Sequence, residues 1–194
     1  MKKLLLIVLL SIVVFQTAKA QAKWSVGAGV EALIPTGDFS SKDYMNAKMG
    51  FGATARGQYL INKEMAVTGT IGYEGWSSDL GGDIADVSFT NIPLDFGFKY
   101  LFGREKIRFY LLGEVGLNFW KAKATGKNGY TGSIDHSATL LGFAPSAGVD
   151  IALDKDIDLE AAIRYQIMGS DKDATGDKAP NHFGIRVGVN FGLK

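Results

Sequence analysis

Apolar and polar residues alternate along most of the chain from Trp24 onward. Apolar side chains take every second position, and glycine, serine, threonine or charged residues lie between them. A period of two is typical of a β-strand whose two faces meet different surroundings. The alternation predicts eight strands, at Trp24–Ile34, Met49–Tyr59, Met65–Tyr73, Phe89–Leu101, Ile107–Phe119, Leu141–Leu153, Ile157–Ile167 and Phe183–Leu193.

The connections between these strands alternate in length. Short turns are predicted at Ile61–Glu64, Gly103–Lys106 and Asp154–Asp156. Longer polar loops are predicted at Thr36–Ala47, Ser77–Asp86, Lys121–Ala138 and Gly169–Asn181. An up-and-down order of strands places all the long loops at one rim and all the short turns at the other. The sequence therefore predicts an all-β fold, an eight-stranded antiparallel up-and-down barrel.

Two prolines fall inside predicted strands. Pro93 and Pro145 each remove a backbone donor, and a closed barrel has no free edge at which that loss is harmless. We expect a bulge or a local break in strand pairing at both positions.

The apolar face decides whether the barrel lies in water or in lipid. An eight-stranded lumen is only wide enough to be filled by side chains or to hold one small ligand. It cannot take in eight rows of Phe, Tyr, Leu, Val and Ile, whereas the opposite face is rich in small and charged residues. The apolar face is therefore expected to point into lipid. Each strand has about the 9–11 residues that a tilted spanning strand needs, and short turns opposite long loops are typical of outer-membrane barrels.

Aromatic residues gather near the ends of the apolar rows, as in the two interfacial girdles of membrane barrels. The general preference of aromatic residues for strands is the alternative explanation. Those assigned to the short-turn rim are Trp24, Tyr59, Tyr100 and Phe109. Those assigned to the loop rim are Phe51, Tyr73, Trp76, Phe119, Trp120, Phe143, Tyr165 and Phe183.

Charged residues of both signs share the predicted inward face. Isolated charges in a narrow interior are costly, so mixed signs predict pairing into a network. We expect this network to hold the barrel shut, and the alternative is a selectivity lining for a pore. Its predicted members are Glu31, Glu74, Asp95, Lys99, Arg108, Glu114, Asp158, Glu160, Arg164 and Arg186.

The beginning of the chain has the pattern of a cleaved secretory signal. Lys2 and Lys3 precede an apolar run, Leu4–Phe15, and Ala18–Ala20 supplies the small-x-small pattern of a cleavage site. The apolar run is shorter than the roughly 20 residues of a membrane-spanning helix. We expect residues 1–20 to be removed and residues 21–194 to form one barrel domain.

Composition narrows the chemistry further. The chain has 21 basic and 20 acidic residues, and without Lys2, Lys3 and Lys19 the balance is 18 against 20, a net charge of −2. Such a balance gives no electrostatic reason to expect nucleic acid as a partner. The absence of cysteine excludes disulfides, thiolate metal sites, cysteine nucleophiles and a lipid anchor on cysteine. No cofactor and no metal are expected.

Several short motifs, degenerate one by one, occur in an order that resembles the small OmpA-type and OmpX-type barrels of the outer-membrane β-barrel domain family. Asn91-Ile92-Pro93-Leu94 leads to Phe98-Lys99-Tyr100, Ile107-Arg108-Phe109-Tyr110 leads to Gly113-Glu114-Val115-Gly116, and the chain closes with Gly188-Val189-Asn190-Phe191. The resemblance covers the whole chain after the signal and implies insertion by the barrel-assembly machinery. The family's last strand ends on an aromatic residue, whereas Gly192, Leu193 and Lys194 follow here.

Similar barrels that modify lipids use a serine and a histidine near the outer rim. His136 lies beside Ser137 in the third long loop, and neighbours in an extended segment point to opposite sides. They therefore do not form a ready nucleophile–base pair. His182 lies at the mouth of the last strand and faces the lumen by parity. We expect both histidines to be solvated loop residues, and no catalytic residue is predicted.

Two other loop patterns are candidate ligand sites. The acids Asp79, Asp83 and Asp86, with Gly81 and Gly82, could bind calcium loosely. Their spacing does not match an EF-hand, and a solvated turn is the simpler interpretation. Three glycines of the third long loop lack the strand-to-helix context of a phosphate-binding loop: Gly126, Gly129 and Gly132.

These observations predict a non-enzymatic, integral outer-membrane protein with both termini in the periplasm. Its expected role is structural or one of surface interaction through four outer loops. A narrow porin-like channel for small or apolar solutes is the alternative, followed by a lipid-modifying enzyme. Outer-membrane lipid is the expected surrounding, and the sequence does not specify a ligand for the loops.

Overall fold

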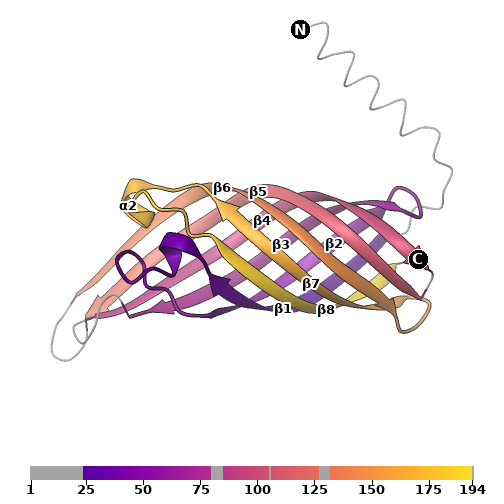
Figure 1. Cartoon of the computed structure of the whole chain (residues 1–194), viewed down its shortest axis with the longest axis horizontal. Helices are drawn as coiled ribbons and strands as arrows, with labels where there is room; N and C mark the ends of the chain where they lie inside the picture. The colour runs from indigo at the N-terminus through magenta and orange to yellow at the C-terminus, as the bar shows by residue number, and fades with distance from the viewer. Residues whose placement is uncertain (1–23, 80–84, 105, 127–131, 194) are drawn as a thin grey trace, which may run out of the picture.

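The computed structural model describes residues 24–79, 85–104, 106–126 and 132–193. Its strands follow one another around a closed antiparallel barrel in which β1 pairs with both β2 and β8 (Figure 1). The predicted eight-stranded up-and-down barrel is therefore confirmed. The predicted signal segment, residues 1–20, lies outside the described residues. The strands are β1 (Trp24–Pro35), β2 (Gly50–Leu60), β3 (Met65–Ser78), β4 (Ala85–Arg104), β5 (Ile107–Gly126), β6 (Ser133–Ala152), β7 (Ile157–Met168) and β8 (His182–Leu193).

Side chains along each strand alternate between an exposed apolar face and a buried, largely polar one. On β5, Val115 is 53% exposed whereas its neighbour Glu114 is 1% exposed. Water would penalise such an apolar outer surface, and lipid favours it. The predicted outward direction of the apolar rows is therefore confirmed. In the part of the chain that the structure describes, no helix is long and apolar enough to cross a membrane.

Three strands are much longer than the others. β4, β5 and β6 each have 20 residues, whereas the remaining strands have 11 to 14. Their loop-side ends pair with one another up to Ala85 opposite Gly126 and Thr125 opposite Ser133. We call this extension the rim blade, and it consists of residues 85–90, 121–126 and 133–140.

The rim blade corrects the predicted loop at Lys121–Ala138, because residues 121–126 and 133–138 are strand, and it shortens the predicted loop at Ser77–Asp86, whose ends, residues 77–78 and 85–86, are strand. Lysine, serine and threonine give these stretches the composition of a loop. Their alternation nevertheless continues, with Ala122 and Ala124 on the inner side and Lys123 between them. At this rim, the alternation of residues was therefore a better guide to strand structure than the loop-like composition.

Both prolines interrupt pairing on one side of their strand. β4 pairs with β3 at Leu94 and again at Asn91, and Pro93 between them has no β3 partner. Likewise, Pro145 has no partner on β7, although it stays opposite Gly113 on β5. The register is the same before and after each gap, so the structure has a local break without a bulge. The predicted interruption is confirmed at both positions.

Two of the long loops fold back over the barrel mouth. The first contains a 3₁₀ turn, η1 (Gly37–Phe39), and the fourth contains a short helix, α2 (Lys172–Thr175). The Asp171 side chain caps α2 by accepting hydrogen bonds from two backbone N–H groups. The two loops are joined where the backbone N–H of Thr36 donates to the carbonyl oxygen of Asn181 at 2.9 Å. α2 and the C-terminus lie at opposite ends of the barrel (Figure 1).

Candidate functional site

Buried apolar side chains fill the barrel mouth at the loop end. Phe39, at the end of η1, is fully buried. Its ring centroid lies 5.2 Å from that of Trp76 and 5.4 Å from that of Trp120. The first loop therefore packs its aromatic side chain against two strand tryptophans. The whole group, which we call the rim cluster, consists of Leu33, Phe39, Met45, Ala47, Trp76, Phe89, Trp120, Leu140, Met168 and Ala174.

The rim cluster corrects two members of the predicted aromatic girdle. Trp76 and Trp120 are only 4% and 1% exposed, so they do not face the membrane interface. Trp76 has the same parity as the inward Glu74, and Trp120 has the same parity as the inward Asn118. Tyr73, which has the opposite parity, is 58% exposed as the girdle requires.

His182 lies directly beneath the rim cluster. It is fully buried, and its ring centroid lies 4.9 Å from that of Trp76. Its Nε2 atom is 3.6 Å from a carboxylate oxygen of Glu74. The prediction that His182 is solvated is therefore wrong, although it does face the lumen. Neither of these two contacts is with a serine.

Arg164 organises a first group of charges, which we call the loop-side ion cluster. Its Nη2 atom contacts Glu74 and lies 3.4 Å from Glu31 Oε2, while its Nη1 atom lies 3.7 Å from Asp95 Oδ2. Asn91 donates to the second oxygen of Glu74 at 2.8 Å. All of these residues are buried. Side chains from β1, β3, β4 and β7 thus meet at the Arg164 guanidinium or at its partner Glu74, and together they cross the bore.

Arg56 organises a second group, the turn-side ion cluster. Its Nη1 atom lies 2.6 Å from Glu160 Oε1, and its Nη2 atom lies 3.6 Å from Glu114 Oε2. Its Nε–H donates to the Thr70 hydroxyl at 3.0 Å. The Tyr110 hydroxyl donates to the same Glu160 carboxylate. The planar guanidinium of a β2 residue therefore bridges carboxylates of β5 and β7 across the bore, a geometry that suits arginine.

Two more ion pairs lie towards the short turns. Lys99 Nζ is 2.7 Å from Asp150 Oδ2 and 3.8 Å from the centre of the Tyr110 ring, and all three residues are buried. Arg108 and Asp158 pair at 2.9 Å, and about a quarter of each side chain is exposed. A second group of buried apolar side chains lies in the same part of the lumen: Ala66, Leu101, Tyr110, Leu112 and Ala162.

The structure brings the predicted inward charges into these contacts. Arg186, the remaining one, lies 3.7 Å from Glu160. Glu114 pairs with Arg56 in the turn-side ion cluster. Sequence reasoning omitted Arg56 and Asp150 from the network. The alternation along the strands could have identified both residues as inward, because each lies two residues from another inward position.

Inward glycines make room for the larger lumen side chains. A Cβ atom at Gly148 would lie 2.6 Å from the Tyr110 ring, and one at Gly97 would lie 2.5 Å from Cγ of Glu114. Both distances are well inside normal van der Waals contact. At these two positions, the side chains in the lumen therefore pack directly against the barrel wall.

The other candidate residues lie apart at the loop end. His136 and Ser137 are exposed neighbours on the rim blade, where His136 stands opposite Ala122 of β5. Asp79 is exposed and pairs with Lys48 at 2.8 Å. Asp83, Gly81, Gly82 and Gly129 lie outside the described residues. Among the residues that are described, no group of three acids or histidines is placed to hold a metal ion.

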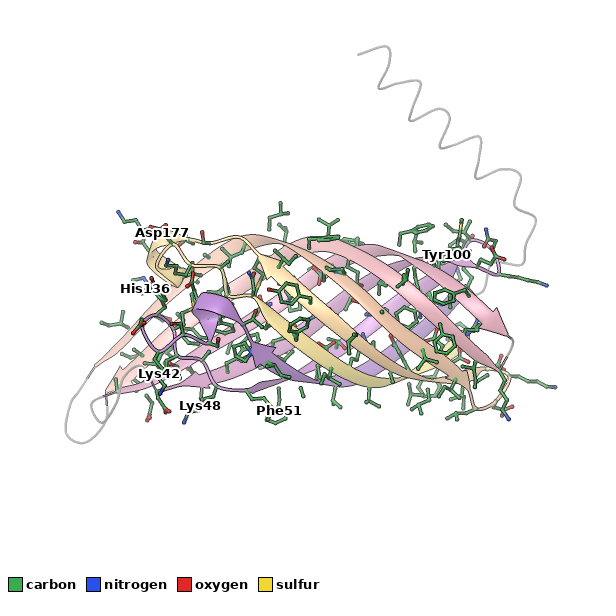
Figure 2. The ribbon with its side chains drawn as sticks, in the orientation of Figure 1. Lys42, Lys48, Phe51, Tyr100, His136 and Asp177 are labelled. Atoms are coloured by element: carbon green, nitrogen blue, oxygen red, sulfur yellow. The ribbon has the colours of Figure 1, made fainter. Side chains whose placement is uncertain are left out.

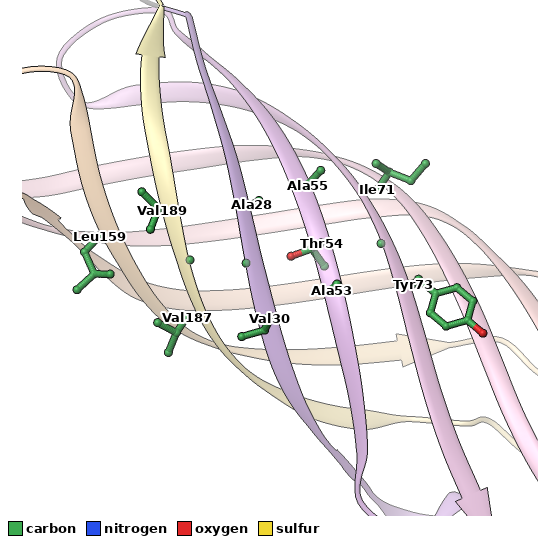
Figure 3. A pocket seen from close by; sticks show the side chains of 13 residues that line it. Ala28, Val30, Ala53, Thr54, Ala55, Ile71, Tyr73, Leu159, Val187 and Val189 are labelled. Atoms are coloured by element: carbon green, nitrogen blue, oxygen red, sulfur yellow. The ribbon is translucent and has the colours of Figure 1, made fainter.

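A groove of about 710 Å³ hollows the outer surface of the barrel across β1, β2, β3 and β8 (Figure 3). Its floor contains Ala28, Ala53 and Ala55, and larger side chains such as Val187 and Tyr73 border it. The lining is apolar and faces outward with the membrane rows. It can provide van der Waals contact to an acyl chain, and it contains no set of polar groups for catalysis.

Comparison with known proteins agrees with this architecture. The model of the outer membrane protein beta-barrel domain family matches residues 5–191. A comparison with curated proteins gave no match. Among solved structures, Neisserial surface protein A aligns with a TM-score of 0.62 at 19% identity, over 89% of this chain and 99% of that chain.

Two further structures align over similar lengths. Ail, the attachment invasion locus protein of Yersinia pestis, was solved with the heparin analogue sucrose octasulfate. It aligns with a TM-score of 0.56 at 19% identity, over 89% of this chain and 97% of Ail. A major outer membrane protein from Thermus thermophilus gives a TM-score of 0.57 at 15% identity, over 90% and 100% of the two chains. At these identities the likeness concerns the fold.

Proposed function

Because the chain belongs to the outer membrane protein β-barrel domain family, we propose that it is a closed, non-enzymatic barrel that acts at the cell surface through its loop end. It is an integral protein of the outer membrane, and lipid surrounds its apolar outer rows. Its role is structural or one of surface interaction, and it conducts no steady flow of solutes.

A lumen occupied along its length by apolar clusters and ion pairs carries this proposal. The rim cluster covers the loop end, and the two ion clusters centred on Arg164 and Arg56 cross the bore beneath it. The Lys99–Asp150 pair and a second apolar group lie towards the turns. An eight-stranded lumen leaves little room beyond its own side chains. Such packing supports a closed barrel over a selectivity lining.

The proposed orientation places the loops outside the cell and both termini in the periplasm. Outer-membrane barrels have short periplasmic turns and longer outer loops, and η1, α2 and the rim blade all belong to the loop end. Export by a cleaved signal at residues 1–20 and insertion by the barrel-assembly machinery are part of the same proposal.

Recognition at the loop end is the proposed activity. The Ail structure contains the heparin analogue sucrose octasulfate, and by analogy we expect a ligand at the loop end of this barrel. The rim charges do not single out a polyanion, because three lysines at the loop end each lie beside an acid and so form no continuous patch of positive charge. Lys48 pairs with Asp79 at 2.8 Å, and Lys121 pairs with Asp135 at 2.5 Å. Lys178 lies 3.6 Å from Asp38.

Planar-bilayer recording tests the closed state. Folded protein, with its incorporation verified by vesicle flotation, should give no steady current at any moderate voltage. A stable open current from the wild type would instead favour the narrow channel. Mass analysis of lipid A from expressing and deleted cells addresses the enzyme alternative, and we expect identical lipid A from both strains.

A further inference from the structure

The rim blade exposes an apolar inner face outside the membrane-facing part of the barrel. Two cross-strand rows form this face. Val87, Ala124 and Ile134 align in the upper row, and Phe89, Ala122 and His136 align in the row below. Phe89 belongs to the rim cluster, but Ile134 is 66% exposed. An exposed apolar face in the aqueous part of a protein commonly marks a binding surface.

A cavity of about 420 Å³ separates this face from the folded loops. Tyr44 and Met45 of the first loop and Thr175 and Gly176 at the end of α2 form the opposite wall. Ligand sites in proteins have volumes of about 300–1,000 Å³ and mostly apolar linings. The rim cluster closes the floor, so the cavity opens to the loop end and not into the lumen.

Two side chains on the wall of this cavity can contact an anion. Lys178 and His136 line it together with one acid, Asp43, whereas Lys123 alternates with the inward Ala122 and Ala124 and points to the outer face of the blade. Lys178 holds its ammonium 4.3 Å above the Tyr44 ring. Its 3.6 Å contact with Asp38 joins two partly exposed side chains, and such ion pairs contribute little energy. The ammonium can therefore accept a second anionic partner. Figure 2 shows His136 at the same end as Asp177 of the fourth loop.

We propose that this cavity binds a small, water-soluble amphiphile with an apolar tail and one anionic group. The tail would lie against the row of Val87, Ala124 and Ile134, and the anion would face Lys178 and His136. The ligand would come from the external medium, because the cavity opens at the loop end. This site adds a ligand class to the proposed surface role, and it does not depend on whether the barrel conducts.

Titration calorimetry on the full protein in lipid nanodiscs tests the site, with octanoate as the probe and empty nanodiscs as the blank. Octanoate should bind saturably at one site and more tightly than the neutral octanamide. Ile134→Glu should weaken octanoate binding at least about tenfold, because it adds a like charge to an apolar wall. Ala124→Trp should have a similar effect by occupying the space.

Two controls separate this site from general partitioning. Ser133→Glu places the same charge one residue away, on the other face of the blade, and should leave binding unchanged. Lys178→Gln should lower octanoate binding to the level of octanamide and leave octanamide binding unchanged. Absence of saturable heat above the blank would overturn the proposal. So would undiminished binding in both Ile134→Glu and Ala124→Trp, or equal binding of octanoate and octanamide by the wild type.

Discussion

At each position of this barrel, the surroundings of the side chain decide which residue types are tolerated. An outward residue within the membrane must be apolar, because no partner compensates a charge there. An inward residue can be charged, provided that a second side chain reaches it across the bore. Val115 and Glu114 are adjacent on β5 and illustrate the two cases, since one is exposed to lipid and the other is buried against Arg56.

Val115→Arg should hinder folding into bilayers. The residue is outward and 53% exposed, and an arginine on the lipid face near the midplane costs about 2–4 kcal/mol. Denaturant titration in lipid vesicles, followed by the mobility of the folded form on unheated gels, measures this loss. Ser133→Arg, on the exposed blade, is the matched control and should change the midpoint very little. Equal effects of the two substitutions would contradict the outward assignment of Val115.

Asp150→Asn should destabilise the folded barrel. Asp150 forms a buried pair with Lys99 at 2.7 Å, and removing one partner of a buried pair typically costs about 3–5 kcal/mol. Adding Lys99→Met should restore part of the loss, because the unpaired charge is then gone. The midpoint of urea unfolding in vesicles reports both changes. The exposed Lys48–Asp79 pair supplies the control, since Asp79→Asn should cost less than about 1 kcal/mol.

At the scale of elements, the first long loop is a structural part of the mouth because Phe39 anchors it. Phe39→Ala should release this loop while leaving the strands intact. Large-to-small changes at buried phenylalanine cost about 3–5 kcal/mol, and here the loss falls on the packing against Trp76 and Trp120. Limited trypsin digestion should cut faster at Lys42, and tryptophan emission should shift to the red.

Tyr44→Ala is the control for this change, because Tyr44 lies in the same loop and is 44% exposed. It should leave the tryptophan emission unchanged. If Phe39→Ala digests at the wild-type rate, Phe39 does not hold the loop in place.

The same scale shows what the alternation could predict and what it could not. Period two identified every strand and the inward parity of residues such as Glu114 and Arg164, because each strand reports its own two faces. It could not identify Arg56 as the partner of Glu160, since that contact depends on closure and stagger of the whole barrel. The burial of Phe39 could not be predicted either, because an isolated aromatic residue in a polar loop belongs to no periodic pattern.

At the scale of the whole molecule, the barrel has two unlike ends. The loop end has folded connections and the projecting ends of the 20-residue strands β4, β5 and β6, whereas the turn end has short connections and the C-terminus (Figure 1). Figure 2 shows Lys42 and Lys48 at the first end and Tyr100 towards the other. The rim cluster covers the loop end and the ion clusters cross the bore beneath it, so closure depends on several separate groups of contacts.

Protease added to intact cells should therefore cut the protein only at its loop end. Lys42 and Lys172 are exposed on connections at that end, and Lys63 and Lys155 are exposed in turns at the other. Trypsin should cleave at the first two sites in intact cells, because the proposed orientation places them outside the outer membrane. Permeabilised cells are the control, since cleavage at Lys63 and Lys155 should then appear too. Mass analysis of the fragments identifies each cut, and cleavage at Lys63 or Lys155 in intact cells with Lys42 and Lys172 spared would reverse the orientation.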